Sequence, residues 1–182
     1  MMLKPELSVL RALCLSALLC VGLIACSGGD DADEEGGESV VTPPPRGSLI
    51  DNPPPRTASV SVSDLLAVLT ASSAGQLLLE FITAPTCGID IHQLRYNTVD
   101  PTGQPTTASG ALMIPTGADP ACQGPRPIVT YAHGTSVERS FNIADITNED
   151  NAEGLLMAVA FAARGYIVVA PNYAGFDTSA LD

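Results

Sequence analysis

Two short apolar runs separated by a helical segment constrain this chain more than any other feature. Residues 127–132 (PIVTYA) and 166–170 (YIVVA) are short and apolar, which is typical of buried strands. Between them, residues 151–164 place apolar side chains on one stripe of a helix, and Gly165 follows where helices commonly end. A strand, a crossover helix and a second strand predict parallel neighbours in an α/β sheet, with the first strand central and buried.

Two helix starts carry capping signals. Ser61 and Asp64 stand three residues apart and predict a short helix over residues 61–71. Asp150 and Glu153 have the same spacing at the start of the crossover helix. Apolar residues between positions 77 and 82 predict that helical structure continues after the first helix.

A β-hairpin is predicted ahead of the parallel unit. Residues 91–98 alternate between apolar and polar side chains, residues 100–103 (DPTG) are a turn signal, and residues 107–114 form the return strand. His92 shares the parity of the apolar positions. We therefore expect a packed, hydrogen-bonded structural histidine at this position.

The N-terminus has the pattern of a bacterial lipoprotein signal. Residues 12–25 are uncharged and apolar, which is short for a membrane span of ~20 residues and suits a signal-peptide core. The stretch ends in Leu-Ile-Ala-Cys26, which resembles a lipobox. The resemblance implies removal of residues 1–25 and acylation of Cys26, whose lipid chains would hold the protein at a membrane surface. The alternative is an ordinary secretory signal with an incidental cysteine.

Residues 26–57 are expected to form a flexible tether. An acidic run with glycines at 30–38 is followed by proline triplets at 43–45 and 53–55. Such a stretch cannot bury enough apolar area to offset the entropy of ordering it. The folded domain is therefore predicted to cover residues 58–182.

Charge and histidine content exclude other classes of site. The chain has 8 Lys and Arg against 20 Asp and Glu, a net charge of −12, which disfavours nucleic acid because phosphate binding needs clustered basic residues. Only 2 His are present and they are far apart, so no metal site is expected.

Cys87 and Cys122 remain once the signal is removed and Cys26 is lipidated. An even pair in an oxidising compartment predicts a disulfide, and two buried free thiols are the alternative.

Two motifs carry a resemblance to a known family. The loop after the first apolar run begins Ala-His133-Gly134-Thr135-Ser136, and the segment through the end of the second run reads VVAPNYAGF over residues 168–176. With this placement of the two motifs, the chain resembles the α/β-hydrolase superfamily. It looks closest to secreted bacterial lipase- and esterase-like hydrolases, from about Cys87 to the end of the chain.

The resemblance implies an oxyanion loop that begins at the His-Gly pair. Ester hydrolysis develops negative charge on the carbonyl oxygen, and backbone N–H groups aimed at that oxygen stabilise it. Gly134 allows close backbone approach, Thr135 is the first candidate donor and Ser136 the second. His133 is implied to be structural or orienting and not the catalytic base.

The remaining machinery of such a hydrolase is absent from the 182 residues. No Gly-x-Ser-x-Gly turn occurs, so the nucleophile, the catalytic acid and the catalytic His are missing. Asn172 and Asp177 replace an Asp and a Gly often seen in the wider superfamily, which leaves the substrate subclass open.

Two functional hypotheses follow. In the first, the chain is the N-terminal part of a lipid-anchored serine esterase or lipase that acts on carboxylic esters without a cofactor, and it is inactive alone. It would lie in a bacterial cell envelope, at the outer membrane on the strength of Ser27, with membrane lipid and an ester or lipid substrate as partners. In the second, it is a non-catalytic surface lipoprotein, a decayed hydrolase or a binding module. The expected fold is α/β, the N-terminal portion of an α/β-hydrolase sheet with an exposed apolar edge, preceded by a disordered tether.

Overall fold

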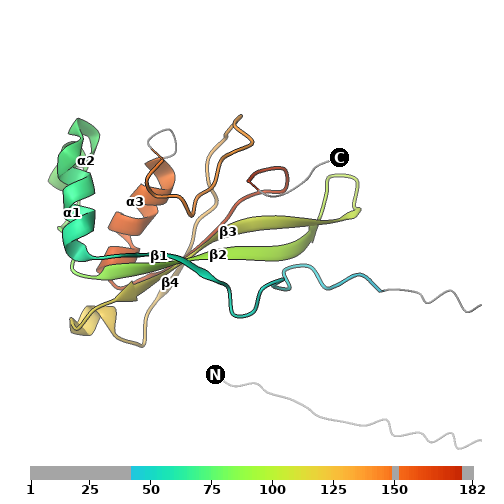
Figure 1. Ribbon diagram of the computed structural model, residues 1–182, viewed down its shortest axis with the longest axis horizontal. Coiled ribbons are helices and arrows are strands. Elements are labelled where there is room, and N and C mark those ends of the chain that lie inside the picture. Colours follow the sequence, from blue (N-terminus) through green and yellow to red (C-terminus); the bar gives the residue numbers. More distant parts are fainter. Residues whose placement is uncertain (1–41, 149–151, 178–182) are drawn as a thin grey trace, which may run out of the picture. The chain divides into compact units, whose positions relative to one another are not determined.

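The computed structural model describes residues 42–148 and 152–177 (Figure 1). The chain divides into two units, residues 1–40 and residues 41–182, and only the second contains described residues. The predicted signal peptide, the lipidation site Cys26, the acidic part of the tether and Asp150 lie outside the described residues.

A five-stranded mixed sheet, with strand order β1-β2-β3-β5-β4, organises the second unit (Figure 1). The strands are β1 (Arg56–Val60), β2 (Gly88–Val99), β3 (Pro105–Thr116), β4 (Ile128–Thr130) and β5 (Ile167–Pro171). The pairs β1–β2, β2–β3 and β3–β5 are antiparallel, and the pair β4–β5 is parallel. The predicted hairpin is β2–β3, and the predicted parallel crossover is β4–α3–β5; both are confirmed.

The helical segments are α1 (Val62–Ala71), α2 (Ser73–Phe81), η1 (Pro120–Cys122), α3 (Ala152–Ala160) and η2 (Ala162–Arg164). The predicted capping box at the start of α1 is present, because Ser61 accepts from the Asp64 amide and the Asp64 carboxylate accepts from the Ser61 amide. The crossover helix, predicted as continuous over 151–164, is instead broken at Phe161 into α3 and η2.

The core lies between one face of the sheet and the helices. Leu65 and Leu69 of α1 and Val159 of α3 are fully buried in the same cluster as Ile91 and Met113, which are paired neighbours on β2 and β3. In Figure 1, α1 and α3 lie over the same side of the sheet. This packing fixes α3, and with it the loop that leads from β4 into α3.

The tether predicted to extend to residue 57 ends earlier in the structure. The Gly47 amide donates to Asn97 O (2.7 Å) and the Ile50 amide donates to Arg95 O (2.8 Å), so residues before β1 already pair with β2. The outer edge of β2 offers unpaired main-chain groups, and main-chain pairing needs no apolar side chains. A prediction from composition considers only apolar burial and therefore missed it.

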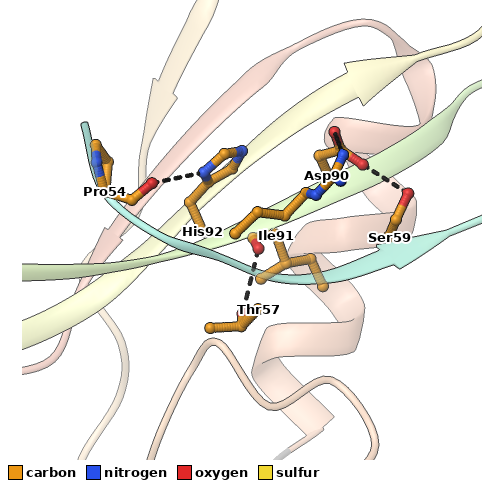
Figure 2. A network of polar contacts seen from close by, with 7 residues as sticks. Pro54, Thr57, Ser59, Asp90, Ile91 and His92 are labelled. Atoms are coloured by element: carbon orange, nitrogen blue, oxygen red, sulfur yellow. Dashed lines mark hydrogen bonds and ion pairs between the residues drawn. The ribbon is translucent and has the colours of Figure 1, made fainter. Parts of the chain in front are cut away.

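Side chains add to this attachment (Figure 2). Ser59 Oγ donates to Asp90 Oδ1 (2.6 Å), and Arg56 pairs with Asp90 Oδ2 (2.8 Å). His92 Nδ1 lies 2.9 Å from Pro54 O, so the prediction of a hydrogen-bonded structural histidine is confirmed.

Among the described residues, the first apolar run forms an edge strand and not a central one. Residues 127–132 were expected to be central and buried, but β4 covers only Ile128–Thr130 and lies at the edge of the described sheet, with Ile128 66% exposed. The reason is that β5 inserts between β3 and β4. An apolar run shows that a strand suits a two-sided environment, but it does not reveal the spatial order of the strands.

A disulfide joins Cys87, just before β2, to Cys122 at the end of η1. The same region is tied to the end of the crossover, because the Cys87 amide donates to Ala163 O (2.9 Å). Gly165 closes η2 with φ 95°, and a Cβ there would lie 2.3 Å from Ala121 O. Only glycine suits this close, left-handed turn.

Candidate functional site

Both sequence motifs lie at the same edge of the sheet. The loop with His133 follows β4, and the segment with Asn172 and Tyr173 follows β5, which runs parallel to β4. The carboxyl ends of parallel strands meet at one edge, which is where α/β folds bind ligands. The two motifs are in direct contact, since Tyr173 OH donates to His133 O (2.8 Å).

The His133 ring packs against three aromatic side chains. It is 4% exposed and stacks between Phe141 and Tyr173, with centroid distances of 4.2 and 4.1 Å, while Phe176 meets it edge-on at 5.4 Å. Its Nδ1 lies 2.8 Å from Gly134 O, and its buried Nε2 has no hydrogen-bond partner within the described residues. This environment suits an orienting residue, because Nδ1 is engaged with Gly134 O and Nε2 is buried, so neither ring nitrogen is exposed to a substrate.

Glu153 holds the backbone of the loop. The Gly134 amide donates to Glu153 Oε2 (3.0 Å), and Tyr131 OH donates to the same oxygen (2.5 Å). The hydrogen bond from Tyr131, more than that from Gly134, keeps the pKa of Glu153 below its usual range against the opposing effect of burial. The same contact raises the pKa of Tyr131 to about 12. The spacing of Asp150 and Glu153 predicted only a capping role for Glu153, and its position in the first turn of α3, directly after the loop, was the available signal.

The amides of the next two residues have no hydrogen-bond partner within the described ranges. The N–H groups of Thr135 and Ser136 make no hydrogen bond to any other part of the chain that the structure describes. Thr135 is exposed, and the Ser136 hydroxyl accepts from the Glu138 amide (3.2 Å). The loop therefore offers two adjacent backbone donors to a ligand.

Asn172 fixes the far end of the loop. It is fully buried, its Nδ2 donates to Ser109 Oγ (2.8 Å), and its Oδ1 accepts from the Ile143 amide (3.1 Å). Its own carbonyl accepts from Tyr96 OH (2.9 Å). An asparagine supplies both a donor and an acceptor at this position, which an aspartate would not when ionised.

Asp177 makes a second tie from the same segment. Its amide donates to Arg139 O (2.7 Å) in the loop, and its carboxylate accepts from Gln93 Nε2 (2.7 Å) on β2. The two departures from the family pattern, Asn172 and Asp177, are thus both used to hold the loop.

The structure forms no triad from the residues it describes. Ser59, Asp90 and His92 lie close on β1 and β2 (Figure 2), but Ser59 donates directly to Asp90 and His92 faces Pro54 O. Within the described ranges, no three His, Cys, Asp or Glu residues gather to hold a metal ion. No single helix there is long and apolar enough to cross a membrane, although the bent pair α1 and α2 passes by length and composition alone.

No protein-family model matches this chain, and a search of the curated proteins gives no match. Solved structures do match. The rice cell wall degrading esterase LipA from Xanthomonas oryzae has a TM-score of 0.58 and 29% identity, over 76% of this chain and 32% of that chain. A point mutant of the same esterase gives a TM-score of 0.56 and 30% identity, over 74% of this chain and 31% of that chain. A Legionella pneumophila protein assigned as a hydrolase gives 0.55 and 25%, over 73% of this chain and 32% of that chain.

These matches establish the fold. The mixed sheet with its crossover helix is an α/β-hydrolase-like fold, as predicted. The chain spans about a third of the length of each solved structure it matches. These neighbours are an esterase and a protein assigned as a hydrolase.

Proposed function

We propose that this chain is the N-terminal part of a lipid-anchored serine hydrolase, of esterase or lipase type, that acts on carboxylic esters. The observation that carries the proposal is the loop after β4, where the amides of Thr135 and Ser136 have no hydrogen-bond partner among the described residues while other groups hold the backbone around them. A rigid loop with unpaired donors is what an oxyanion hole requires.

The chemistry would use these donors in the transition state. An activated serine attacks the ester carbonyl, the carbonyl π electrons move onto oxygen, and the Thr135 amide donates to that oxyanion. Each such donor contributes on the order of 3 kcal/mol of transition-state stabilisation in a water-excluded site. The second donor of this fold is the amide that follows the nucleophile. When the tetrahedral intermediate collapses, the ester C–O bond breaks and the alcohol leaves with the proton that the general base took from the serine. Water then attacks the resulting acyl-enzyme, which releases the carboxylic acid and restores the free serine, and no cofactor takes part.

The proposal divides the site between this chain and further sequence. The 182 residues contain no Gly-x-Ser-x-Gly turn, so the nucleophile, acid and catalytic His would come from outside them. The chain alone is therefore expected to be inactive toward esters.

The location proposed is a bacterial cell envelope, with acylated Cys26 in membrane lipid. The lipobox-like sequence before Cys26 supports it. Labelling of the expressed protein with radioactive palmitate, against a Cys26→Ala control, tests the anchor, and equal labelling of both would contradict it.

The hydrolase proposal is tested on two polypeptides, residues 1–182 alone and the same chain extended through the downstream coding sequence. We expect nitrophenyl-ester turnover that a serine-directed phosphonate abolishes in the extended protein only. Thr135→Pro removes the donor N–H and should lower kcat by about 10²–10³, whereas the matched control Thr135→Ala keeps the N–H and should be nearly unaffected.

Ser136→Pro tests the second donor in the same way. If both proline variants are as active as Thr135→Ala, the oxyanion assignment is wrong. If the downstream sequence supplies no phosphonate-sensitive activity, the non-catalytic lipoprotein becomes the better reading.

A further inference from the structure

Two acidic residues in first helical turns are used differently in this fold. Asp64 in α1 accepts from the amide of its own N-cap Ser61, which completes a capping box. Glu153 occupies the first turn of α3, but its described bonds go to Gly134 and Tyr131, outside the helix. A capping role alone does not explain contacts with two residues of the segment that follows β4.

The contact with Gly134 decides which amides of the loop are available. A carboxylate that accepts from the Gly134 amide occupies that donor and places a negative charge beside it. A second anion is therefore disfavoured at Gly134 by like-charge repulsion. The nearest unpaired donors along the described loop are the amides of Thr135 and Ser136.

We propose that Glu153 is a positioning residue that withdraws the Gly134 amide from the site and thereby assigns oxyanion binding to Thr135 and Ser136. This assignment rests on the hydrolase function proposed above. A Cβ at Gly134 would lie 3.2 Å from Glu153 Oε1, so a side chain at this position would crowd the carboxylate. The loop reaches this geometry with Tyr131 as a second anchor for the same carboxylate.

The charge on Glu153 is held by neutral donors. Tyr131 directly follows β4, His133 lies in the loop, and Tyr173 lies in the segment after β5; these are the titratable groups that interact with the pair. No ion pair joins Glu153 to a basic residue within the described ranges. Hydrogen bonds from Tyr131 and Gly134 keep its pKa below the usual range, so the carboxylate is ionised at neutral pH.

The test is backbone amide NMR of the full chain, with hydrogen exchange and a pH titration. We expect the Gly134 amide to be protected and its signal to follow the ionisation of Glu153 below the ordinary glutamate range. The Thr135 and Ser136 amides should exchange without protection. In Glu153→Ala, exchange at Gly134 should rise by about tenfold or more, as for loss of a charge-assisted hydrogen bond.

Tyr131→Phe is the matched control. It removes the Tyr131 hydroxyl and keeps the Gly134 amide as a donor to Glu153. The Gly134 amide should therefore stay protected from exchange, while the titration of Glu153 moves toward higher pH. A purely structural role for Glu153 would lower stability without linking the Gly134 signal to its titration. If Glu153→Ala does not fold, Glu153→Gln replaces it in the test. We expect the Gly134 amide signal of this variant to lose its pH dependence.

The inference is overturned if the Gly134 amide is not protected from hydrogen exchange, or if its signal does not change when Glu153 titrates or is substituted. It is also overturned if the Thr135 and Ser136 amides are protected to the same degree. These readouts do not need catalysis. If they hold and the extended protein hydrolyses no ester, the proposed function fails while the role of Glu153 in placing Gly134 stands. If the extended protein is active and the Gly134 amide signal does not depend on Glu153, this inference fails and the proposed function stands.

Discussion

Two irregular segments of the molecule are fixed in opposite ways. The anchor segment, residues 47–57, is held along the edge of β2 largely by main-chain hydrogen bonds, such as those from the Gly47 and Ile50 amides. The site loop, residues 133–148, is held mostly by side chains that reach it from other elements: Glu153, Asn172 and Tyr173. Main-chain pairing is available to almost any sequence, whereas each side-chain tie requires one residue type.

The difference teaches where the chain tolerates change. Substitutions in the anchor segment leave its main-chain donors and acceptors in place. A substitution at a residue that ties the site loop removes the tie and leaves a buried polar partner unsatisfied, which costs more than the hydrogen bond contributes. We therefore expect the site end of the molecule to be the more sensitive one.

Asn172→Ala should have the largest effect. It leaves the Ile143 amide and the Ser109 hydroxyl without their partner in a fully buried position, at a cost of about 2–4 kcal/mol in unfolding free energy. The control is Asn97→Ala, because half-buried Asn97 ties Ser48 of the anchor segment by both its side chain and its main chain. Urea denaturation should give less than about 1 kcal/mol for the control. Equal losses would erase the contrast between the two segments.

His133→Ala should have an intermediate effect. It removes a ring stacked between Phe141 and Tyr173, which we expect to cost about 1–3 kcal/mol. His133→Phe keeps the stack and removes the unpartnered Nε2, so it should stay within about 1 kcal/mol of the parent chain. Thermal and urea denaturation check both variants. A phenylalanine variant as unstable as the alanine variant would show that the Nδ1 contact, not ring packing, holds the loop.

Arg56→Ala should have the smallest effect, about 0–1 kcal/mol, because the Arg56 side chain is 57% exposed. The pKa of Asp90 is lowered from its ordinary value of 3.8. The hydrogen bond from the Ser59 hydroxyl is the largest cause, burial opposes it, and Arg56 lowers the pKa further. A lowered folded-state pKa gives stability that is present above the ordinary value and is lost as pH falls through the lowered one. Denaturation between pH 5 and about pH 2 should therefore show a weaker acid dependence in Ser59→Ala than in Arg56→Ala. An Arg56→Ala loss larger than that of His133→Ala would reverse the order.

Much of the fold follows from local patterns in the sequence. The alternation in residues 91–98, the capping box at Ser61 and the apolar runs around the crossover predicted the hairpin, α1 and the parallel pair. These features depend on neighbours in the chain or on a period of two or 3.6 residues. The disulfide between Cys87 and Cys122 followed from the even count and is formed in the structure.

What the sequence did not reveal depends on partners far along the chain. The end of the tether depends on an open strand edge, and the place of β4 depends on the insertion of β5. At the site, the His-Gly motif was visible, but Glu153 and Asn172 act on residues 19 and 29 positions away. No periodic pattern marks such pairs, so their roles came only from the three-dimensional contacts.

The two side-chain hydrogen bonds of Asn172, to Ser109 and Ile143, also have a consequence for folding. Asn172 lies 63 positions after Ser109 and 29 after Ile143, and it follows the strand that must insert between β3 and β4. A chain made from its N-terminus can close the local β2–β3 hairpin early, while contacts of long separation form late. We therefore expect the hydrogen bonds from Asn172 to Ser109 and Ile143 to form only after β5 has paired with β3.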